Sequence, residues 1–431
     1  MTFIESLAST PADADRVRNS TANKVTEEDQ PFHNWYRFVL SFPPHLVRSY
    51  IQKFNLQSGQ TLLDPFCGTG TTVIEAKLNN IDGTGIEANP MAHFASSVKV
   101  DWDVDPENLI NHARNVANQV ESQRDFYQLE ALKTLPEAAY KLLLGNSIYP
   151  IPLHKALILL ETIKVGPNNP YWRHERLAFA TAIVKYCSNL HFAPEVGVRQ
   201  KPEKDPPVLE SWLQEVEAMA EDISQAPRVD AIATIHHADS REVGQLLSPC
   251  SLDGVFTSPP YPNEKDYTRT TRLETVLLGF AQTKEELRHL KKGLLRSNTR
   301  GVYKGDDDDQ WVAGHAEIQR IAQEIENRRI ELGKTSGFER MYHRAVKLYF
   351  GGMARHFASL RPYLKPGAML GYVVGDQASY LQVMIRTGQL LAEIAQPLGY
   401  EVVNIDLFRT RLATATKQQM REEVVVLRWP G

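Results

Sequence analysis

The chain has 431 residues, of which 42% are hydrophobic and 23% are charged, and its formal net charge is −4. This composition is typical of a globular protein of two or three domains, and the charge argues against a globally basic nucleic-acid-binding protein, so any such contact requires a local basic face. The three cysteines have no paired spacing, and the sequence holds no signal peptide and no apolar run of membrane length, so we expect a cytoplasmic protein without disulfides or a metal site.

The N-terminal stretch, residues 1–28, is polar, and we expect it to be disordered. The segment that follows, residues 31–46, is rich in aromatic residues and reads as part of a core.

A glycine-rich turn follows the first apolar strand, which we predict at residues 61–64. Gly68 and Gly70 allow the backbone to turn sharply and approach a ligand, while Thr71 and Thr72 are suited to cap the helix that begins there. The third glycine of the dinucleotide fingerprint is absent, and no Gly-Lys-Ser/Thr follows. The turn is therefore neither a dinucleotide-binding loop nor a phosphate loop.

A second strand, residues 82–87, ends in Glu87. An acid at this place can accept both hydroxyls of a ribose. Together with a helix N-terminus that suits a carboxylate, and without a demand for pyrophosphate, these features fit S-adenosylmethionine.

Residues from about 103 to 228 read as a long, mainly helical insertion with breaks at residues 168–170 and 201–207. The sheet resumes at about residue 230, with a strand at residues 231–235. Asp239 follows that strand and reads either as a ligand-binding acid or as the cap of a helix over residues 240–247.

The next apolar strand, residues 252–256, runs into the sequence Thr257-Ser258-Pro259-Pro260-Tyr261. Two prolines end the strand and lack a backbone N–H, so the loop offers carbonyl acceptors and few competing donors. Ser258 then lies at the carboxyl end of the strand, the edge where open α/β sheets bind ligands. The loop suits a planar amino group, although a rigid turn without function has the same sequence pattern.

The region after this loop reads as helical and carries two groups of cations, which could bind phosphates or lie on solvated helix faces. The first group is Arg288, Lys291, Lys292, Arg296, Arg300 and Lys304, and the second is Arg340, Arg344, Lys347, Arg355 and Arg361. The four acids at residues 306–309 predict an exposed loop between helices. A strand at residues 364–376 and two final strands, residues 400–408 and 422–429, complete the pattern.

The segments 64–72 and 257–261 together resemble the DNA amino-methyltransferases, which methylate the N4 of cytosine or the N6 of adenine with S-adenosylmethionine. The resemblance implies a class I methyltransferase (Rossmann-like) α/β fold, with a mostly parallel seven-stranded sheet, a C-terminal antiparallel hairpin and mainly helical insertions. It also implies a double-stranded DNA substrate, and an enzyme, monomeric or dimeric, that acts alone or with a cognate restriction endonuclease. The serine of the second motif favours cytosine, and the alternatives are an N6-adenine DNA methyltransferase, an RNA base methyltransferase or a cofactor-binding protein without turnover.

The resemblance assigns two groups of site residues. The cofactor-binding residues are Asp64, Pro65, Phe66, Cys67, Gly68, Gly70, Thr71, Thr72, Glu87 and Asp239. The catalytic residues are Ser258, Pro259, Pro260 and Tyr261. The Ser258 oxygen and the Pro259 carbonyl would hold the hydrogens of the target amine, and Tyr261 would stack on a base taken out of the duplex. Residues 31–46 resemble a segment that, in permuted members of the family, closes over the methionine part of the cofactor.

The expected domains follow from this assignment: residues 29–102 form the first part of the catalytic domain, residues 103–228 a helical insertion suited to target recognition, and residues 229–431 the second part, with a helical insertion at about 270–345. The large insertion lies outside the usual position of a target-recognition domain, so either insertion could read DNA. Cys250 follows a proline, as in cytosine C5 methylases, but it precedes the strand that ends in Ser258 and reads as a buried or idle thiol.

Overall fold

The computed structural model describes residues 23, 25–37, 41–192, 195–200, 203–412 and 419–431. The predicted disorder of residues 1–28 concerns mostly residues outside this range. The part that is described includes a 3-10 helix, Glu27–Asp29, which begins within this stretch and ends at the buried Asp29. Phe38 of the aromatic segment and residues 201 and 202 of the predicted break also lie outside the described residues.

Seven strands form one sheet in the part of the chain that the structure describes, in the order β5-β2-β1-β6-β7-β9-β8. The strands are β1 (Thr61–Asp64), β2 (Asp82–Glu87), β5 (Ala233–His237), β6 (Leu252–Thr257), β7 (Leu364–Gly375), β8 (Glu401–Leu412) and β9 (Gln419–Arg428). The first five strands of this order are mutually parallel, whereas β9 is antiparallel to both β7 and β8. The predicted mostly parallel sheet with a C-terminal hairpin is confirmed.

The chain reverses its direction of winding between β1 and β6, since β2 and β5 lie on one side of β1 and the later strands lie on the other. A crevice forms at such a switch point, outside the carboxyl ends of the strands. The glycine-rich turn after β1 and the Ser258 loop after β6 both begin at this crevice.

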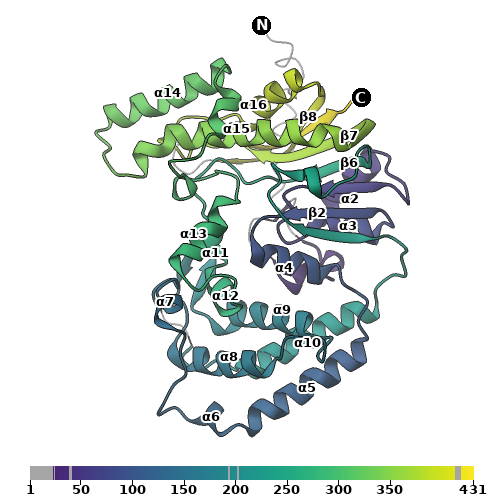
Figure 1. Ribbon diagram of the computed structural model, residues 1–431, viewed down its shortest axis with the longest axis vertical. Helices are drawn as coiled ribbons and strands as arrows, with labels where there is room; N and C mark the ends of the chain where they lie inside the picture. The colour runs from purple at the N-terminus through teal and green to yellow at the C-terminus, as the bar shows by residue number, and fades with distance from the viewer. Residues whose placement is uncertain (1–22, 24, 38–40, 193–194, 201–202, 413–418) are drawn as a thin grey trace.

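Helices cover both faces of the sheet (Figure 1). Successive residues of a strand point to opposite faces. Thus Leu62 packs in a cluster with α2, while Leu63 packs in a cluster with α15 and α16. The helices of this lobe are α2 (Pro44–Lys53), α3 (Thr71–Leu78), α4 (Pro90–Lys99), α14 (Ala316–Glu331), α15 (Tyr342–Leu360) and α16 (Thr387–Ala395).

A second lobe, mainly helical, lies below the sheet in Figure 1 and joins it through α4 and the helices after β6. Its helices are α5 (Pro106–Ser122), α6 (Arg124–Tyr127), α7 (Glu137–Tyr140), α8 (Pro150–Thr162), α9 (Trp172–Ala182) and α10 (Val208–Ser224). It also holds the antiparallel pair β3 (Leu190–Phe192) and β4 (Val196–Val198). The helices after β6 are α11 (Tyr267–Thr270), α12 (Arg272–Leu277) and α13 (Lys284–Lys292).

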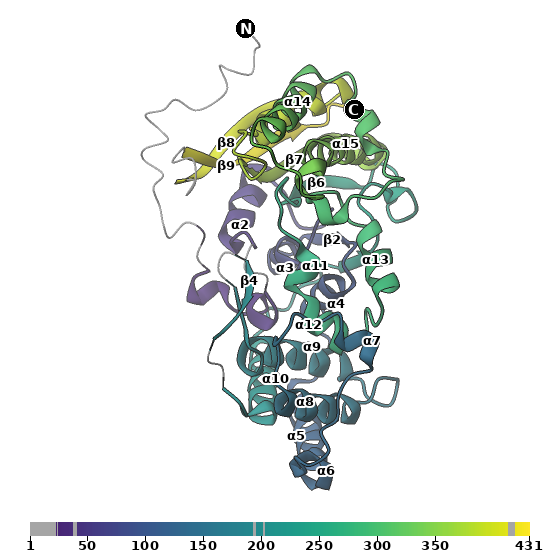
Figure 2. The ribbon, with the colours of Figure 1, turned by 90° about the vertical axis from the view of Figure 1, so that its left-hand side faces the viewer.

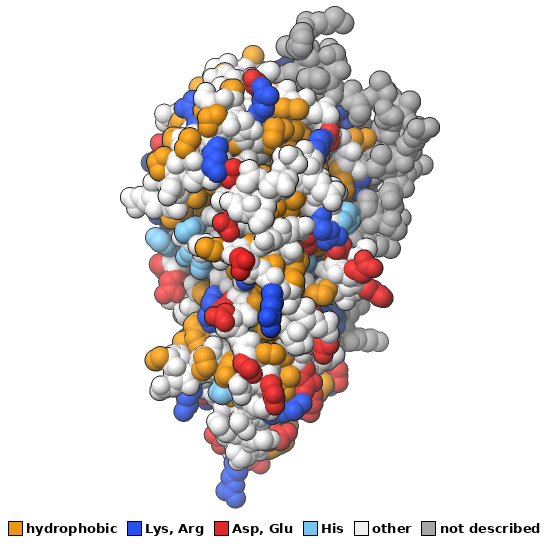
Figure 3. Space-filling model, turned by 90° about the vertical axis from the view of Figure 1, so that its right-hand side faces the viewer, with side chains coloured by type: hydrophobic (Ala, Val, Ile, Leu, Met, Phe, Trp, Pro, Cys, Tyr) orange, Lys and Arg blue, Asp and Glu red, His pale blue; other side chains and the backbone are white. Residues whose placement is uncertain are grey.

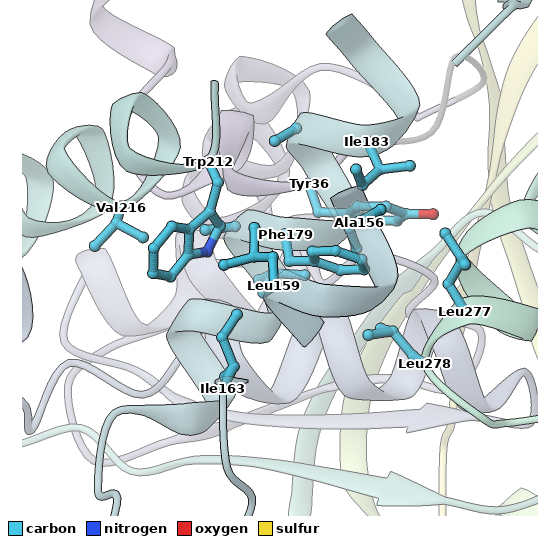
Figure 4. Close-up of a cluster of buried hydrophobic side chains, with 14 of the residues drawn as sticks. Tyr36, Ala156, Leu159, Ile163, Phe179, Ile183, Trp212, Val216, Leu277 and Leu278 are labelled. Carbon is cyan, nitrogen blue, oxygen red and sulfur yellow. The ribbon is translucent and has the colours of Figure 1, made fainter. Parts of the chain in front are cut away.

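The lobe has an apolar core of its own, shown in Figure 4, in which Trp212 and Phe179 are fully buried. The Trp212 indole donates a hydrogen bond to the Glu175 carbonyl at 2.9 Å, so its polar end is satisfied. Leu277 of α12 and Tyr36 of the N-terminal segment join the same cluster, which fastens this lobe to the sheet. In the described residues, no helix has the length and apolarity needed to cross a bilayer.

Candidate active site

A cavity of about 660 Å³ opens at the carboxyl ends of β1, β2, β6 and β7, which is a size suited to a small-molecule ligand. The predicted site residues that line it are Pro65, Phe66, Cys67, Gly68, Thr71, Glu87, Ser258, Pro259, Pro260 and Tyr261. Asp64, Gly70, Thr72 and Asp239 are not among its lining residues. The two sequence motifs therefore meet at one cavity, although they are far apart in the chain.

Asp64 is buried behind the cavity and has a structural role, since it does not line the cavity. Its carboxylate accepts hydrogen bonds from the Thr257 hydroxyl at 2.5 Å and from the Phe66 backbone N–H at 3.1 Å. Burial raises the pKa of Asp64 to about 6, against the effect of the Thr257 hydrogen bond. Asp64 thus joins the end of β1 to the end of β6.

The glycine turn has the backbone that its sequence predicts. Gly68 has φ of 50° and Gly70 has φ of 87°, both in the left-handed region. A Cβ at Gly70 would also lie 3.1 Å from the Ser96 Cβ. The predicted caps are wrong, because Gly70 itself is the N-cap of α3 and no side chain caps the helix. The N-terminus of α3 therefore reaches the cavity uncapped, with Thr71 on its wall.

Glu87 lies at the end of β2 and is held by two backbone donors. One carboxylate oxygen accepts from the Gly68 N–H at 2.8 Å and the other from the Asn89 N–H at 2.7 Å. Burial raises the pKa of Glu87 to about 7. Each oxygen keeps a further lone pair, so the oriented carboxylate can accept a pair of hydroxyls from a ligand in the cavity.

Cys67 is buried, and burial raises the pKa of its thiol well above its ordinary value. It therefore stays protonated and packs against the sheet, where a Cβ at Gly85 would lie 2.9 Å from its sulfur. Cys250 is exposed and lies before β6, at the end of the strand that is remote from Ser258. Neither position suits a nucleophile for a base in the cavity.

Asp239 does not cap a helix, because its carboxylate binds Arg241. Its carboxylate accepts from the Arg241 backbone N–H at 2.9 Å and from the guanidinium, including a contact of 2.5 Å. The predicted helix over residues 240–247 is wrong, since the structure forms a turn and the 3-10 helix Val243–Gln245 there. Ala238 and Ser240, on either side of Asp239, do line the cavity.

The Ser258 hydroxyl has a defined role in hydrogen bonding. It donates to the backbone carbonyl of Val373, in the neighbouring strand β7, at 3.1 Å. Because its single proton is used there, the oxygen acts as an acceptor: it is within hydrogen-bonding reach of the Tyr261 phenol and keeps a further lone pair for a ligand in the cavity. The Tyr261 ring packs on Gly375, where a Cβ would lie 3.2 Å from the ring, and burial raises the pKa of its phenol.

The aromatic N-terminal segment divides between core and cavity. Phe32, Trp35 and Tyr36 belong to the core, whereas Phe42 lines the cavity. The buried amine of Lys99 joins this segment to the glycine turn, since it donates to the carbonyls of His33, Tyr36 and Thr69. Burial lowers the pKa of Lys99 to about 7.

The predicted exposed acidic loop is wrong for Asp308, whereas Asp307 is exposed. Asp308 is 4% exposed and accepts from Arg241 and from Arg355, while Asp306 binds Arg296. The 3-10 helix Asp308–Val312 lies against α15 at a glycine, Gly351, where a Cβ would be 1.9 Å from the Asp308 carbonyl oxygen. Two of the four acids, Asp306 and Asp308, thus pair with cations, and Arg296 and Arg355 of the predicted phosphate-binding groups are used in these pairs.

Several residues of the cavity were not found by sequence reasoning. They are Lys265, Gln377, Phe408, Arg409, Arg411 and Glu422. Five of them lie on β8 and β9 or just after β7. No local motif marks these residues, because only the pairing of β8 with β9 and of β9 with β7 brings them to the crevice.

Comparison with known proteins agrees with this geometry. The N6_N4_Mtase family, described as DNA methylase, matches residues 14–96. Type II methyltransferase M.BsoBI of Geobacillus stearothermophilus is 27% identical over 438 residues, covering 93% of this chain and 85% of that protein. Type II methyltransferase M.AvaI of Nostoc sp. is 23% identical over 466 residues, covering 96% and 91%.

Two solved structures have a low overall similarity, with a TM-score of 0.30 each, and add nothing to the topology described above. TrmN from Thermus thermophilus is 11% identical and covers 93% of this chain and 53% of that chain. The rRNA methyltransferase aviRa from Streptomyces viridochromogenes is 10% identical and covers 98% and 94%.

The strand order, with a single inverted strand among the described seven and a cavity at the switch point, defines a class I methyltransferase fold. Two motifs face that cavity, one suited to a ribose-bearing methyl donor and one to an amino group. The chain is similar to the DNA amino-methyltransferases, enzymes that transfer the methyl group of S-adenosylmethionine to an amino group of a DNA base.

Proposed function

We propose that this protein methylates the N4 of cytosine in double-stranded DNA at a specific sequence. The observation that carries the proposal is the hydrogen bond from Ser258 to the Val373 carbonyl, which turns the serine oxygen into an acceptor at the wall of the cavity. The serine form of this motif, in the family that the chain resembles, usually accompanies cytosine.

The target amine needs acceptors because its lone pair is delocalised into the ring. The nitrogen becomes a nucleophile only as it pyramidalises, and acceptors on its hydrogens stabilise that change. We assign these acceptors to the Ser258 oxygen and the Pro259 carbonyl. The Tyr261 phenol stays neutral because its pKa is raised, and its ring offers a stacking surface for a base taken out of the duplex.

The residues present fit S-adenosylmethionine. The uncapped N-terminus of α3 suits the methionine carboxylate, Gly68 lets the backbone approach it, and the oriented Glu87 carboxylate suits the ribose hydroxyls. When bound, this cofactor supplies a methyl group already activated on a sulfonium. The protein then has to place the amine in line with that methyl group. Asp239, held by Arg241, is assigned to the adenine amino group and lies just behind the wall.

The relatives support a place in restriction and modification. Both are named Type II methyltransferases and match more than nine-tenths of this chain. We propose that the protein protects a site from a cognate endonuclease, with residues 29–102 and 229–431 as catalytic domain and residues 103–228 as the insertion that reads the sequence.

A methyl-transfer assay tests this function. Purified protein is incubated with labelled S-adenosylmethionine and either plasmid DNA or total tRNA and rRNA, and the nucleosides are identified by mass spectrometry. We expect N4-methylcytosine in DNA only; N6-methyladenine, or label in RNA alone, would contradict the proposal.

The Ser258→Ala variant is expected to keep cofactor binding and to lose at least 100-fold in rate, on the order of the loss of one transition-state hydrogen-bonding group. Ser224→Ala, on the surface of α10, serves as the control.

A further inference from the structure

Two cations stand at the rim of the cavity on the side of Tyr261. Lys265 lies in the loop after β6, and Arg411 lies near the end of β8. They are close enough that Arg411 contributes to lowering the pKa of Lys265, after the larger effect of burial. Both belong to the lining of the same cavity as Ser258 and Tyr261.

Neighbouring acids neutralise this pair only in part. Glu422 takes its closer contact from Arg409, Nε to Oε2 at 2.5 Å, and Glu195 pairs with Arg269 at 3.7 Å. Arg411 is 44% exposed and forms a longer ion pair with the other oxygen of Glu422, at 3.5 Å. Among the described residues, Lys265 has no carboxylate within ion-pair distance, although the charges of Glu195 and Glu422 act on it more weakly.

The backbone around Lys265 is fixed. Its N–H donates to the Asn263 side chain at 3.0 Å, and its carbonyl accepts from the Asn298 side chain at 3.0 Å. The Arg411 guanidinium donates to the Asp376 carbonyl at 3.3 Å. Both side chains therefore project from anchored positions, which lowers the entropy lost when they bind an anion.

The strand order places this pair away from the cofactor loop. Along the carboxyl edge, the order is Glu87 on β2, the glycine turn after β1, Ser258 after β6, Val373 on β7, Glu422 on β9 and Arg411 on β8. Because neighbouring strands are about 4.8 Å apart, β8 lies roughly 14 Å beyond β6. A methionine carboxylate at the N-terminus of α3 is on the other side of Ser258.

The chemistry of a nucleotide matches this separation. In cytosine, the amino group and the glycosidic nitrogen lie on opposite sides of the ring, so an amine held at Ser258 directs the sugar and its phosphates away from the methyl donor. We propose that Lys265 and Arg411 bind the backbone phosphates that flank the target nucleotide, an assignment that rests on the proposed DNA methylation. Figure 2 shows the face concerned, with β8, β9, α11 and α13 around it. Figure 3 shows the opposite side of the molecule, on which cationic and acidic side chains are interspersed and do not form a basic patch.

A double-mutant cycle, which combines substitutions in the protein with uncharged phosphates in the DNA, tests the contact of Lys265 and Arg411 with the DNA backbone. The probe is a duplex that carries the methylation site found by sequencing, with or without uncharged methylphosphonates at the two phosphates flanking the target, and its affinity is measured by fluorescence anisotropy. We expect Lys265→Gln and Arg411→Gln each to weaken binding of the unmodified duplex about tenfold and to lower the salt dependence by about one ion. With the methylphosphonate duplex, wild type and variants should bind nearly equally.

Arg428→Gln is the matched control, because Arg428 is on the same hairpin, at the end remote from the cavity, and is paired with Glu401. Calorimetry with S-adenosylmethionine checks that the variants are folded. It also shows whether the two cations bind a DNA phosphate or the carboxylate of the cofactor. A loss of cofactor affinity with unchanged DNA affinity would assign the pair to the methionine carboxylate and overturn the inference. Equal effects of the variants on charged and uncharged duplexes would also overturn it. A wild type that labels no DNA in the methyl-transfer assay overturns the proposed function, whereas a wild type that labels DNA, with variants that bind its unmodified site as tightly, overturns only the phosphate contact.

Discussion

The Asp64 carboxylate and the Thr257 hydroxyl form a buried hydrogen bond of 2.5 Å between the last residue of β1 and the last residue of β6. Each is followed at once by a site motif, the glycine turn after Asp64 and the Ser258 loop after Thr257. The two loops therefore start from one shared point, and a displacement of either strand end moves both.

Replacing Thr257 by valine removes the hydroxyl and keeps the shape of the side chain. We expect the free energy of unfolding to fall by about 1–3 kcal/mol, because the buried carboxylate loses a donor. Thr257→Ser keeps the donor and serves as the control. Urea unfolding at pH 7.5 measures the difference, and equal midpoints for the two variants would show that the hydrogen bond contributes nothing.

Asp64, the partner of Thr257, should make the free energy of unfolding depend on pH with a definite sign. The pKa of Asp64 is raised by burial to about 6 from 3.8, so the folded protein binds the proton more tightly than the unfolded chain. The contribution of Asp64 to stability is therefore lost as pH rises from about 4 through 6. Asp64→Asn should flatten the dependence of the unfolding free energy on pH in this window, and an unchanged slope would contradict the assignment.

Cofactor affinity should depend on the ionisation of Glu87. With a pKa of about 7, roughly a tenth of Glu87 is ionised at pH 6 and roughly nine-tenths at pH 8. Only the carboxylate accepts from both ribose hydroxyls, so binding of S-adenosylmethionine should tighten up to about ninefold over this range.

Calorimetric titration at several pH values tests the prediction. Glu87→Gln should bind more weakly at pH 8 and lose the pH dependence. Glu274→Gln is the matched control, because Glu274 is also buried, has a pKa raised to about 7 and contacts Tyr36 away from the cavity. A pH dependence that disappears in the control and persists in Glu87→Gln would assign it to the wrong carboxylate.

Asp308 links the acidic segment to the region of Asp239 through Arg241. Asp308→Asn removes a charge that faces two guanidiniums, and we expect a loss of about 3–5 kcal/mol in the free energy of unfolding. Cofactor affinity should also fall, since Arg241 would no longer be held against Asp239. Asp307→Asn, at the exposed neighbouring position, should change neither quantity.

Gly351 permits the close approach of two backbones. An alanine there would bring its Cβ to 1.9 Å from the Asp308 carbonyl oxygen, so the 3-10 helix Asp308–Val312 must shift away from α15. We expect a lower thermal midpoint and faster proteolysis near residue 308 in Gly351→Ala. Gly337→Ala is the control, because no atom lies within 4 Å of its added Cβ. Equal midpoints would contradict the clash.

Local motifs were predictable from the sequence because their residues are contiguous. The sheet class and the glycine turn follow from short-range patterns of apolar residues and glycines. The burial of Asp308 does not follow from the acidic segment alone, because it depends on the close approach at Gly351, which is distant in the chain and carries no signal of its own. The cap was misassigned because Gly70 already adopts the left-handed backbone that ends the turn, which leaves Thr71 inside the helix. Arg411 and Glu422 could not be found, since their position depends on strand register.

Lys99 gives the glycine turn a dependence on a distant part of the chain. Its single amine serves the carbonyl of Thr69 within the turn and two carbonyls of the aromatic segment, and that segment is itself fastened to the helical lobe through the hydrogen bond from Trp35 to Asp222. The conformation of the methyl-donor loop therefore depends on residues that precede it in the chain and on the helical lobe to which they are bound. Trimming the chain ahead of the first strand would loosen a loop whose own sequence is untouched.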